Sequence, residues 1–369
     1  MLDIEKLKSA MDFAAERVSK GMSDFGEGFP GAQSQDYVYI ADGGGSWTDG
    51  FWTGMLLLSY EYTGDKKYLE LAKKNVEYFE DRLDRNYALN HHDIGFLYSP
   101  SCVAYYKLTG DEKAKEYGIK AAEHLITRFH ERSGFIQAWG EIGDPNTYFL
   151  IIDCLLNVPL LFWASEVTGD KKYADIAKTH IKTTLSVVVR DDFTTYHTYR
   201  FDYETGKPVG GKTAQGYSDD SCWARGQAWG VYGTALAYYY THDESILPVF
   251  EGVTKKFISG LPEDSVPYWD MIFTSGEEPR DTSSAAIASC GILQMAKEKS
   301  YPEFEAAAER MINSLTDNYT AKKLNSNIIL TDAMYSRPAG HKPEASIYGD
   351  YYFMEAITRM LNKDWKMYW

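Results

Sequence analysis

Long uninterrupted apolar runs are absent from this chain of 369 residues. The hydrophobic fraction is 44%, yet no stretch approaches the roughly 18 consecutive apolar residues that a membrane-spanning helix needs. The first residues, MLDIEKLKSAMDFAAERV, alternate charged and apolar types at helical spacing and lack the basic start, apolar block and small-residue cleavage site of a signal peptide. These absences predict a soluble, cytoplasmic protein with a large core and no membrane partner.

Cysteine and positive charge are both scarce. The four cysteines, Cys102, Cys154, Cys222 and Cys290, show no CxxC spacing and fall in or beside apolar segments, which favours buried free thiols over disulfides or a zinc site. The formal net charge is −15 and no basic cluster offsets it, so the sequence argues against nucleic acid as a partner. An anionic ligand would have to be captured by a few cations inside a pocket, because the long-range field repels it.

Aromatic residues, in contrast, are abundant. They make up 15% of the chain and include 9 tryptophans and 29 tyrosines. Sugar rings stack their apolar faces on such side chains, but a large aromatic core would give the same composition. Composition alone leaves both interpretations open.

A repeated phrase organises the first half of the chain. The segment LLLSYEYTGDKKYLELAKKNVEYF returns in outline as AYYKLTGDEKAKEYGIKAAEHLITRF and LFWASEVTGDKKYADIAKTHIKTTL. In each copy a glycine suits the left-handed position past a helix end, and the following aspartate suits the N-cap of the next helix. These pairs are Gly64-Asp65, Gly110-Asp111 and Gly169-Asp170. The phrase therefore predicts two helices joined by a tight turn.

The helix pairs predict a closed double ring. The helix before each turn is apolar nearly all round, whereas the helix after it carries Lys and Glu on one face, which indicates a buried helix followed by a half-exposed one. Weaker copies follow, and a helix of roughly residues 3–20 supplies the outer partner that the last copy, YYFMEAITRML, lacks. Six inner and six outer helices predict an all-α (α/α)6 barrel, folded as one domain over residues 1–369. An open solenoid would show regular spacing, but Gly64 to Gly110 is 46 residues and Gly110 to Gly169 is 59.

Long loops precede the inner helices and carry most of the unusual side chains. They are SWTDGFW (46–52), NHHDIGF (90–96), QAWGEIGDPNTYFLIIDCLLN (137–157), the segment 196–229 and TDAMYSRPAGHKPEASIYGDYYF (331–353). Because loops at one end of a toroid converge on its centre, we expect these loops to form the functional site.

Two aspartates in these loops are candidates for acid and base chemistry. Asp153 lies inside FLIIDCLLNVPLLF, where burial would raise the pKa of its carboxyl toward the range that a general acid needs; the alternative is an aspartate satisfied by backbone amides at a helix start. Asp93, in HHDIGF, precedes an apolar helix and could equally be an N-cap. Asp49 and Asp350 also have cap interpretations.

The loop 196–229 combines cations, amides and indoles. Its notable side chains are His197, Lys212, Gln215, Trp223, Arg225 and Trp229. This set would suit an acidic sugar, because arginine pairs a carboxylate through two parallel hydrogen bonds while indoles take the ring, although each residue could equally lie on the surface. Trp139 could be a stacking platform or part of the core.

A metal centre is disfavoured. His91, His92 and Asp93 stand together, but adjacent histidines on a turn seldom face one ion, and no further histidine spacing completes a ligand set. We therefore expect no metal and no cofactor.

Seven motifs carry a resemblance to a known family. In order, WTDGFWTG, HHDIGFLYS, IQAWG, IIDCLLNVPLL, YHTYRFD, WARGQAWGVYG and IYGDYYFMEA resemble the motif series of the unsaturated glucuronyl hydrolases, glycoside hydrolase family 88, over nearly the whole chain. The resemblance implies an (α/α)6 barrel that removes the 4,5-unsaturated uronic acid from the non-reducing end of lyase-generated glycosaminoglycan fragments of chondroitin, hyaluronan or heparin type. In that chemistry a proton adds at C4, water adds at C5, and the resulting hemiketal opens to release the aglycone.

The resemblance also implies roles for individual residues. By position, Asp153 matches the general acid and base, and Asp93 matches the second essential carboxylate. Around the unsaturated uronate it places His197, Thr213, Gln215, Arg225, Trp229, Trp139, His92 and Trp47. Two nearby acids with separated pKa values would let one stay protonated while the other assists water or the developing cation.

The last loop departs from the family pattern for unsulfated substrates, because it reads Tyr335-Ser336-Arg337 and then His341-Lys342 where a Tyr-His pair could stand. Ser336, Arg337, His341 and Lys342 could bind a sulfate on the neighbouring aminosugar through charge-assisted hydrogen bonds. We expect unsaturated acidic di- and oligosaccharides as partners, and a monomer or weak homo-oligomer.

Three other functions stay open. An unsaturated rhamnogalacturonyl hydrolase shares the barrel and the chemistry but acts on pectin fragments, and HHDIGF favours the glucuronyl group. A non-catalytic toroid that binds acidic oligosaccharides would lack a carboxylate, whereas Asp93 and Asp153 are both present. An inverting hydrolase of saturated glucans would need a glutamate general acid in the loops, for which Glu141 is the one candidate.

Overall fold

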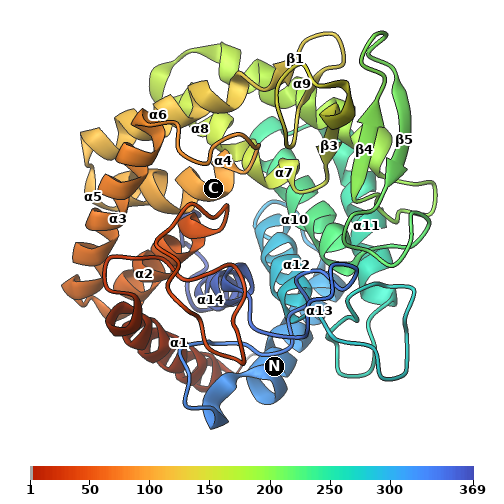
Figure 1. Ribbon diagram of the computed structural model, residues 1–369. Coiled ribbons are helices and arrows are strands. Elements are labelled where there is room, and N and C mark those ends of the chain that lie inside the picture. Colours follow the sequence, from red (N-terminus) through yellow and green to blue (C-terminus); the bar gives the residue numbers. More distant parts are fainter. Residues whose placement is uncertain (1–2) are drawn as a thin grey trace.

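The computed structural model describes residues 3–369, which form two concentric rings of helices (Figure 1). The inner ring consists of α2 (Asp49–Thr63), α4 (Ile94–Tyr98) continued by η1 (Ser99–Val103) and α5 (Ala104–Thr109), α7 (Cys154–Asn157) continued by α8 (Pro159–Thr168), α10 (Ala224–Thr241), α12 (Thr282–Met295) and α14 (Ile347–Leu361). Because α14 packs against both α12 and α2, the ring closes on itself. The closed ring confirms the predicted (α/α)6 barrel and excludes the open solenoid.

The outer ring covers the inner helices one by one. It consists of α1 (Ile4–Phe25), α3 (Lys66–Asp84), α6 (Glu112–Ile126), α9 (Lys171–Val188), α11 (Leu247–Ser259) and α13 (Pro302–Ser314), with a short 3-10 turn, η3 (Glu244–Ile246), leading into α11. As predicted, α1 supplies the partner that α14 lacks, since it packs against α14 and α2. It runs beyond the predicted end near residue 20, because Gly21 and Phe25 continue its buried face and Gly26 then ends the helix at φ 60°.

The Thr-Gly-Asp turns have the predicted geometry. The glycines Gly64, Gly110 and Gly169 have φ of 71°, 74° and 75°, the left-handed region that residues with a Cβ avoid. The aspartates that follow each accept a hydrogen bond from the backbone N–H two residues ahead, at 2.9–3.0 Å. Each turn thus ends an inner helix and starts an outer one with two residues.

Burial differs between the two rings in the predicted sense. Along α2 every residue from Asp49 to Ser59 is buried, whereas α3 buries one face and exposes its lysines together with Glu70 and Glu77. The buried side chains of the six inner helices belong to one continuous apolar cluster. The core therefore fills the axis of the barrel, and the outer ring shields it.

Two inner helices are irregular where a proline interrupts them. Pro100 has no N–H to donate, and the backbone widens into the π turn η1 around it. Pro159 begins α8 directly after Val158, where the short helix α7 ends. Each of these two inner helices is therefore interrupted close to its loop end.

Five short strands, which were not predicted, accompany the helices in the described chain. β1 (Phe129–His130) pairs with β2 (Phe135–Ile136), and β3 (Phe149–Ile151), β4 (Thr198–Phe201) and β5 (Pro208–Lys212) form an antiparallel sheet in that order. The apolar run FLII, within the predicted loop 137–157, pairs with β4 and is therefore a strand, with Phe149 opposite Arg200 and Ile151 opposite Thr198. As a result Asp153 lies at the junction between β3 and α7 and not within a helix.

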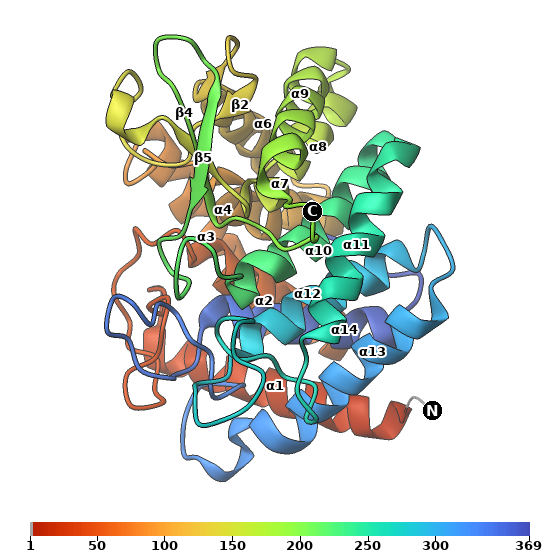
Figure 2. The ribbon, with the colours of Figure 1, turned by 90° about the vertical axis from the view of Figure 1, so that its right-hand side faces the viewer.

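The long loops gather at one end of the rings. Figure 2 shows the β4–β5 hairpin and the loops 26–48 and 325–346 projecting on the left-hand side of the view. Within residues 3–369 no helix is both long and apolar enough to cross a membrane.

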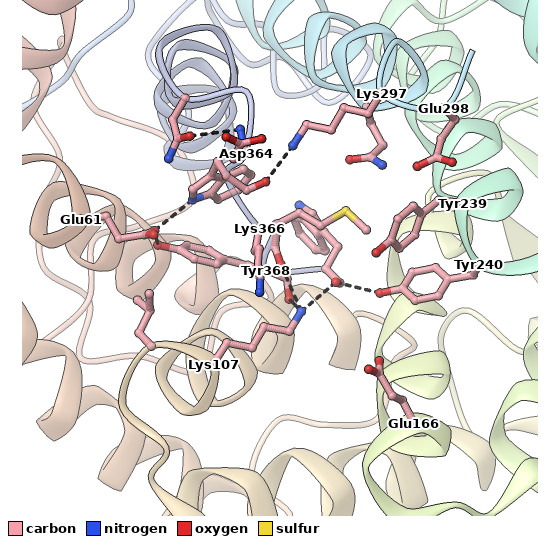
Figure 3. A pocket seen from close by; sticks show the side chains of 16 residues that line it. Glu61, Lys107, Glu166, Tyr239, Tyr240, Lys297, Glu298, Asp364, Lys366 and Tyr368 are labelled. Atoms are coloured by element: carbon pink, nitrogen blue, oxygen red, sulfur yellow. Dashed lines mark hydrogen bonds between the residues drawn. The ribbon is translucent and has the colours of Figure 1, made fainter.

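Residues 365–369 occupy the other end of the barrel (Figure 3). Lys107 Nζ donates to the carbonyl oxygens of Met367, Tyr368 and Trp369 at 3.0–3.1 Å, and burial lowers the pKa of this lysine to about 8. The Tyr240 hydroxyl also donates to the Trp369 carbonyl, at 2.8 Å. A cavity of about 770 Å³ remains beside this segment.

Candidate active site

A pocket of about 260 Å³ opens among the loops that precede the inner helices. Its lining residues are Trp47, Asp93, Trp139, Asp153, His197, Gln215, Trp223, Arg225, Trp229 and Tyr335. They come from the loops ahead of α2, α4, α7, α10 and α14 and from the first turns of α10. The loops therefore converge on the axis as predicted.

Backbone hydrogen bonds between these loops hold the site together. The His92 N–H donates to the carbonyl of Ala138 at 2.8 Å, and the Ala138 N–H donates to the carbonyl of Phe149, in β3, at 3.0 Å. The Ile152 N–H donates to the carbonyl of His197 at 3.0 Å, which continues the β3–β4 pairing by one residue. This arrangement joins segments far apart in the sequence and sets Asp93, Trp139, Asp153 and His197 around one space.

Asp93 and Asp153 occupy equivalent positions in the fold. Each stands at the N-cap of an inner helix, α4 or α7, and in the described chain neither carboxylate caps its helix. The side chains keep 9% and 17% of their surface exposed, which is enough to be reached from the pocket. The N-cap interpretation of Asp93 and the backbone-satisfied interpretation of Asp153 are therefore wrong, since both carboxylates stay free for chemistry.

His92 lies between the two carboxylates. Its Nε2 atom is 3.2 Å from Asp153 Oδ1 and 3.5 Å from Asp93 Oδ1. Neither ring nitrogen has an aligned hydrogen-bond partner among residues 3–369, so these are charge contacts at close range and not well-directed hydrogen bonds. Burial lowers the pKa of His92, but the negative charges of Asp93 and Asp153 outweigh burial and leave it raised.

The environment moves the pKa values of the two aspartates apart. For Asp153, burial dominates and raises the pKa, and the nearby charge of Asp93 adds to the rise. For Asp93, burial also acts upward, but nearby groups, the charge of His92 foremost, outweigh it, so the pKa is lowered. The carboxyl of Asp153 is therefore more readily protonated than that of Asp93.

Polar side chains form the opposite wall. The His197 Nδ1 atom accepts hydrogen bonds from the N–H groups of Ala214 and Gln215 at 3.0 and 3.2 Å, which leaves Nε2 as the proton-bearing nitrogen. Burial, together with the charge of Arg225, lowers the pKa of His197 to about 3, so its ring is neutral. The Arg225 guanidinium donates to the carbonyls of Met334 and Tyr335, both at 2.7 Å, so its fork is engaged by the protein and it contributes charge to the wall.

Four indoles surround the carboxylates. Trp139 stands at the rim with 41% of its surface exposed, which excludes the core interpretation. Trp229 is buried behind the pocket, and Trp223 packs against the ring of His197 with centroids 4.3 Å apart. Trp47 stacks on Tyr348 at 5.4 Å, and its Nε1 donates to the hydroxyl of Tyr335 at 3.0 Å. The abundant aromatics thus serve both the core and the pocket.

The profile of glycosyl hydrolase family 88 matches residues 30–367. This chain belongs to that family. Among curated family relatives, the unsaturated chondroitin disaccharide hydrolase of Streptococcus pneumoniae is 46% identical and aligns with 100% of this chain and 95% of its own length. The unsaturated glucuronyl hydrolase of Bacillus sp. strain GL1 is 41% identical over 93% of both proteins.

Solved structures give the same relationship. The unsaturated glucuronyl hydrolase of Streptococcus agalactiae superposes with a TM-score of 0.97 at 45% identity, covering 100% of this chain and 95% of its own. The corresponding Bacillus sp. GL1 enzyme gives 0.94 at 39% identity, covering 97% of each. The family predicted from the sequence motifs is confirmed, and this protein is a glycoside hydrolase.

Within residues 3–369, some of the predicted site residues do not line the pocket. Thr213 is part of a loop turn, where its hydroxyl oxygen accepts from the Gly216 N–H at 2.7 Å. His92 lies beneath the carboxylates and not on the pocket surface. The set Ser336, Arg337, His341 and Lys342 follows the lining residue Tyr335 on the last loop. Glu141 is exposed and accepts from Asn90 at 2.6 Å, away from the pocket, which removes the basis for a glutamate general acid.

One group of side chains in residues 3–369 has a geometry that could hold a metal ion. It is formed by His92, Asp93 and Asp153, whose ligand atoms lie within 4.8 Å of one another. It differs from the set considered from the sequence, because His91 Nε2 instead contacts the carbonyl of Ala88 at 2.9 Å. Treatment with a chelator tests whether an ion takes part.

Two lining residues, Trp223 and Tyr335, had no assigned role: Trp223 was named only among the side chains of the loop 196–229 that would suit an acidic sugar, and Tyr335 only as a neighbour of Ser336. Trp223 stands next to Ala224, where α10 begins, and a tryptophan at the start of an inner helix is the signal that could have placed it. Tyr335 could be placed only through its hydrogen bond with Trp47, a residue 288 positions away.

Asp49 and Asp350 are not helix caps. Asp49 is the first residue of α2 and forms a buried ion pair with Arg82 at 2.8 Å. Asp350 accepts from the N–H groups of Ile329 and Leu330 at 3.0 and 2.8 Å, which ties the last loop to α14. A cap would have bonded neighbouring amides, whereas the fold provides both carboxylates with partners far away in the sequence.

Proposed function

We propose that this family 88 hydrolase removes the 4,5-unsaturated uronic acid from the non-reducing end of lyase-generated glycosaminoglycan oligosaccharides, of chondroitin, hyaluronan or heparin type. The curated relatives are named unsaturated chondroitin disaccharide hydrolase and unsaturated glucuronyl hydrolase. The observation that carries the proposal is the pair Asp93 and Asp153, held beside His92 with pKa values moved in opposite directions.

The size of the pocket supports action at a chain end. Ligand pockets typically have volumes of about 300–1,000 Å³. At about 260 Å³, this pocket suits a single sugar ring and leaves the rest of the oligosaccharide outside. An enzyme that cuts within a chain would need an open groove, so the terminal unsaturated residue is the part that enters.

In the proposed first step Asp153 donates its proton to C4 of the double bond. Its raised pKa keeps the carboxyl protonated, which a general acid requires. Positive charge then develops at C5 and on the ring oxygen. Asp93, held ionised by its lowered pKa, stabilises this charge.

In the second step water adds at C5. Asp153 is now a carboxylate and accepts the proton that the water loses, which restores the acid for the next cycle. The product at C5 is a hemiketal, which opens and releases the aglycone without a covalent enzyme intermediate. The indoles of Trp47 and Trp229 exclude bulk water around the reacting ring.

The opposite wall would recognise the uronate. His197 Nε2–H and the amide of Gln215 are neutral donors in the lining, and the guanidinium of Arg225, 3.3 Å from the buried carboxylate of Asp281, lines the pocket beside them. Hydrogen bonds from these neutral donors, next to the guanidinium of Arg225, would hold the uronate carboxylate. No flexible charged side chain is then needed beside Asp153. Trp139, half-exposed at the rim, offers a face for the sugar ring or its neighbour.

The ultraviolet absorbance of the conjugated double bond gives a direct test. The wild-type enzyme should remove the absorbance of unsaturated chondroitin and hyaluronan disaccharides. The rate for Asp153→Asn should be lower by about 10²–10⁴-fold, because the asparagine side chain has no acidic proton to donate. Chelator-treated enzyme should keep its rate. If the disaccharides stay unchanged while unsaturated rhamnogalacturonan is consumed, the protein is a hydrolase of pectin fragments. If neither substrate is consumed, a non-catalytic oligosaccharide-binding protein is favoured.

We also propose that the loop 336–342 contacts a sulfate on the neighbouring aminosugar. Arg337 and Lys342 are exposed and have no ion-pair partner among residues 3–369, and His341 packs its ring 5.1 Å from that of Tyr335, at the edge of the pocket. A Streptococcus agalactiae relative, 42% identical with a TM-score of 0.89, has been solved with dGlcA-GalNAc6S. Lys342→Ala should lower the ratio of sulfated to unsulfated turnover; an unchanged ratio would refute this contact.

The compartment and assembly state belong to the same proposal. The four cysteines are all free and buried, which suits the reducing cytoplasm. We propose a cytoplasmic monomer or weak homo-oligomer, which light scattering of the purified protein would test.

A further inference from the structure

Arg82 makes an unusual set of contacts at the end of an outer helix. It lies in the last turn of α3, and its side chain is completely buried together with that of Asp49. All three guanidinium nitrogens donate, and four of the five acceptors are backbone carbonyls of loops: Gly45, Ser46, Tyr87 and Ala88. The fifth acceptor is the carboxylate of Asp49. Arg82 therefore joins two separate loops, 45–49 and 87–88.

The first group of contacts fixes the segment that carries Trp47. Arg82 NH1 donates to the Ser46 carbonyl at 2.9 Å and to Asp49 Oδ2 at 2.8 Å, on either side of Trp47. The same carboxylate oxygen accepts from the Gly45 N–H at 2.8 Å. The chain on both sides of Trp47 is thus held where its indole lines the pocket and donates to Tyr335.

The second group of contacts leads to Asp93. Arg82 NH2 donates to the Ala88 carbonyl at 2.8 Å, and His91 Nε2 contacts the same oxygen at 2.9 Å. With its proton on Nε2, His91 accepts at Nδ1 from the Asp93 N–H at 3.1 Å. A continuous path of hydrogen bonds thus runs from the guanidinium through one carbonyl and one imidazole to the backbone of the catalytic loop.

We infer that Arg82 is a positioning residue that holds the Trp47 loop and the Asp93 loop in fixed relative positions and thereby sets the geometry of the active site. A buried ion pair alone contributes little net stability, because desolvation offsets its attraction. A planar fork that bonds several loop carbonyls at once provides geometric definition that a lysine cannot. The inference rests on the proposed function for its kinetic readout only.

Arg82→Lys is the decisive variant. It keeps the positive charge beside Asp49 but loses the fork that reaches both loops. We expect kcat on an unsaturated disaccharide to fall by about 10–100-fold and KM to rise, since small displacements of catalytic groups have effects of this size. Hydrogen exchange should speed up at the amides of 45–49 and of 88–93 while the amides of α10 and α12 keep their protection.

Two further variants separate the groups of contacts and remain informative if Arg82→Lys folds poorly. Asp49→Asn weakens the contacts around Trp47 and should mainly raise KM. His91→Ala removes the link to Asp93 and should mainly lower kcat and shift the acid limb of the pH profile. In the double variant Arg82→Lys with His91→Ala, the loss in kcat should be clearly smaller than the product of the single losses, because both act on one path.

The hydrogen-exchange readout is independent of which sugar is the substrate. If wild type ignores unsaturated disaccharides but exchange rises in both loops of Arg82→Lys, the function is wrong and the positioning role stands. Arg82 does not position the site if folded Arg82→Lys keeps both kcat and the amide exchange rates of 45–49 and 88–93 within twofold of wild type. The same conclusion follows if the kcat losses of Arg82→Lys and His91→Ala multiply in the variant that carries both.

Discussion

His92 is the residue through which the two carboxylates influence each other. It was expected among the substrate contacts, but it lies buried beneath Asp93 and Asp153, within 3.5 Å of both. A protonated imidazole at this position favours the ionised form of either neighbour. Because burial raises the pKa of Asp153 while the charge of His92 helps to lower that of Asp93, we propose that the proton of the group rests on Asp153 and that Asp93 stays charged.

This arrangement predicts a bell-shaped pH profile for kcat/KM. Activity needs Asp93 ionised, so it is lost as pH falls through the lowered pKa of Asp93. Activity also needs Asp153 protonated, so it is lost as pH rises through the raised pKa of Asp153. In His92→Asn, which removes the positive charge, both limbs should move to higher pH. Rates followed by ultraviolet absorbance from acid to alkaline pH would show this, and a basic limb that stays in place or moves down would contradict it.

At the scale of elements, the helix pairs depend on a small set of turn residues. Asp111 is the clearest example, since one carboxylate oxygen accepts from the N–H groups of Lys113 and Ala114, both at 3.0 Å. These are donors at the start of α6 that no residue of the helix itself can satisfy. The cap therefore stabilises the helix without any contact to the core.

Asp111→Ala should lower the free energy of unfolding by about 1 kcal/mol, the usual loss when such a cap is removed. Asp111→Asn keeps an acceptor oxygen at the same place and serves as the matched control, with a change of only a few tenths of that amount. Urea unfolding followed by circular dichroism would measure both. Equal losses in the two variants would show that charge and not the cap matters here.

At the scale of the whole molecule, closure makes the helix pairs depend on each other. α14 packs between α12 and α2, and the segment 365–369 fills the end of the barrel opposite the site. Trp369 stacks on Tyr352 at 5.8 Å and donates from Nε1 to Glu355 at 2.9 Å. Its ring also packs 6.0 Å from Phe96, which follows Asp93 by three residues. The two ends of the barrel thus share one core.

We therefore propose that residues 1–369 unfold as a single domain. Thermal unfolding should give one transition, reported alike by tryptophan fluorescence and circular dichroism. Trp369→Ala should move that single transition down, with a loss of about 3–5 kcal/mol, as large buried aromatics do. Trp369→Phe, which keeps most of the stacking, should lose less. Two separate transitions in wild type would refute the single domain.

Much of the fold could be predicted because its signals are local. The left-handed glycine at Gly64, the cap at Asp65 and the change from an all-apolar to an amphipathic helix depend on neighbours within a few residues. The strand at 149–151 could not be predicted in this way, because its partner β4 lies some 50 residues later and the apolar run FLII fits a buried helix equally well.

The sequence by itself determined the helix pairs, the closed barrel and, through its motifs, the family and the two aspartates. Only the tertiary structure decided that the pKa values of Asp153 and Asp93 shift in opposite directions, that the Arg225 guanidinium donates to backbone carbonyls, and that Arg82 joins the Trp47 and Asp93 loops. The physical reason is that helices and turns follow from short-range backbone preferences. Proton affinities and loop positions instead depend on burial and on charges brought together through space, such as Asp93 and Asp153, which the chain separates by 60 residues.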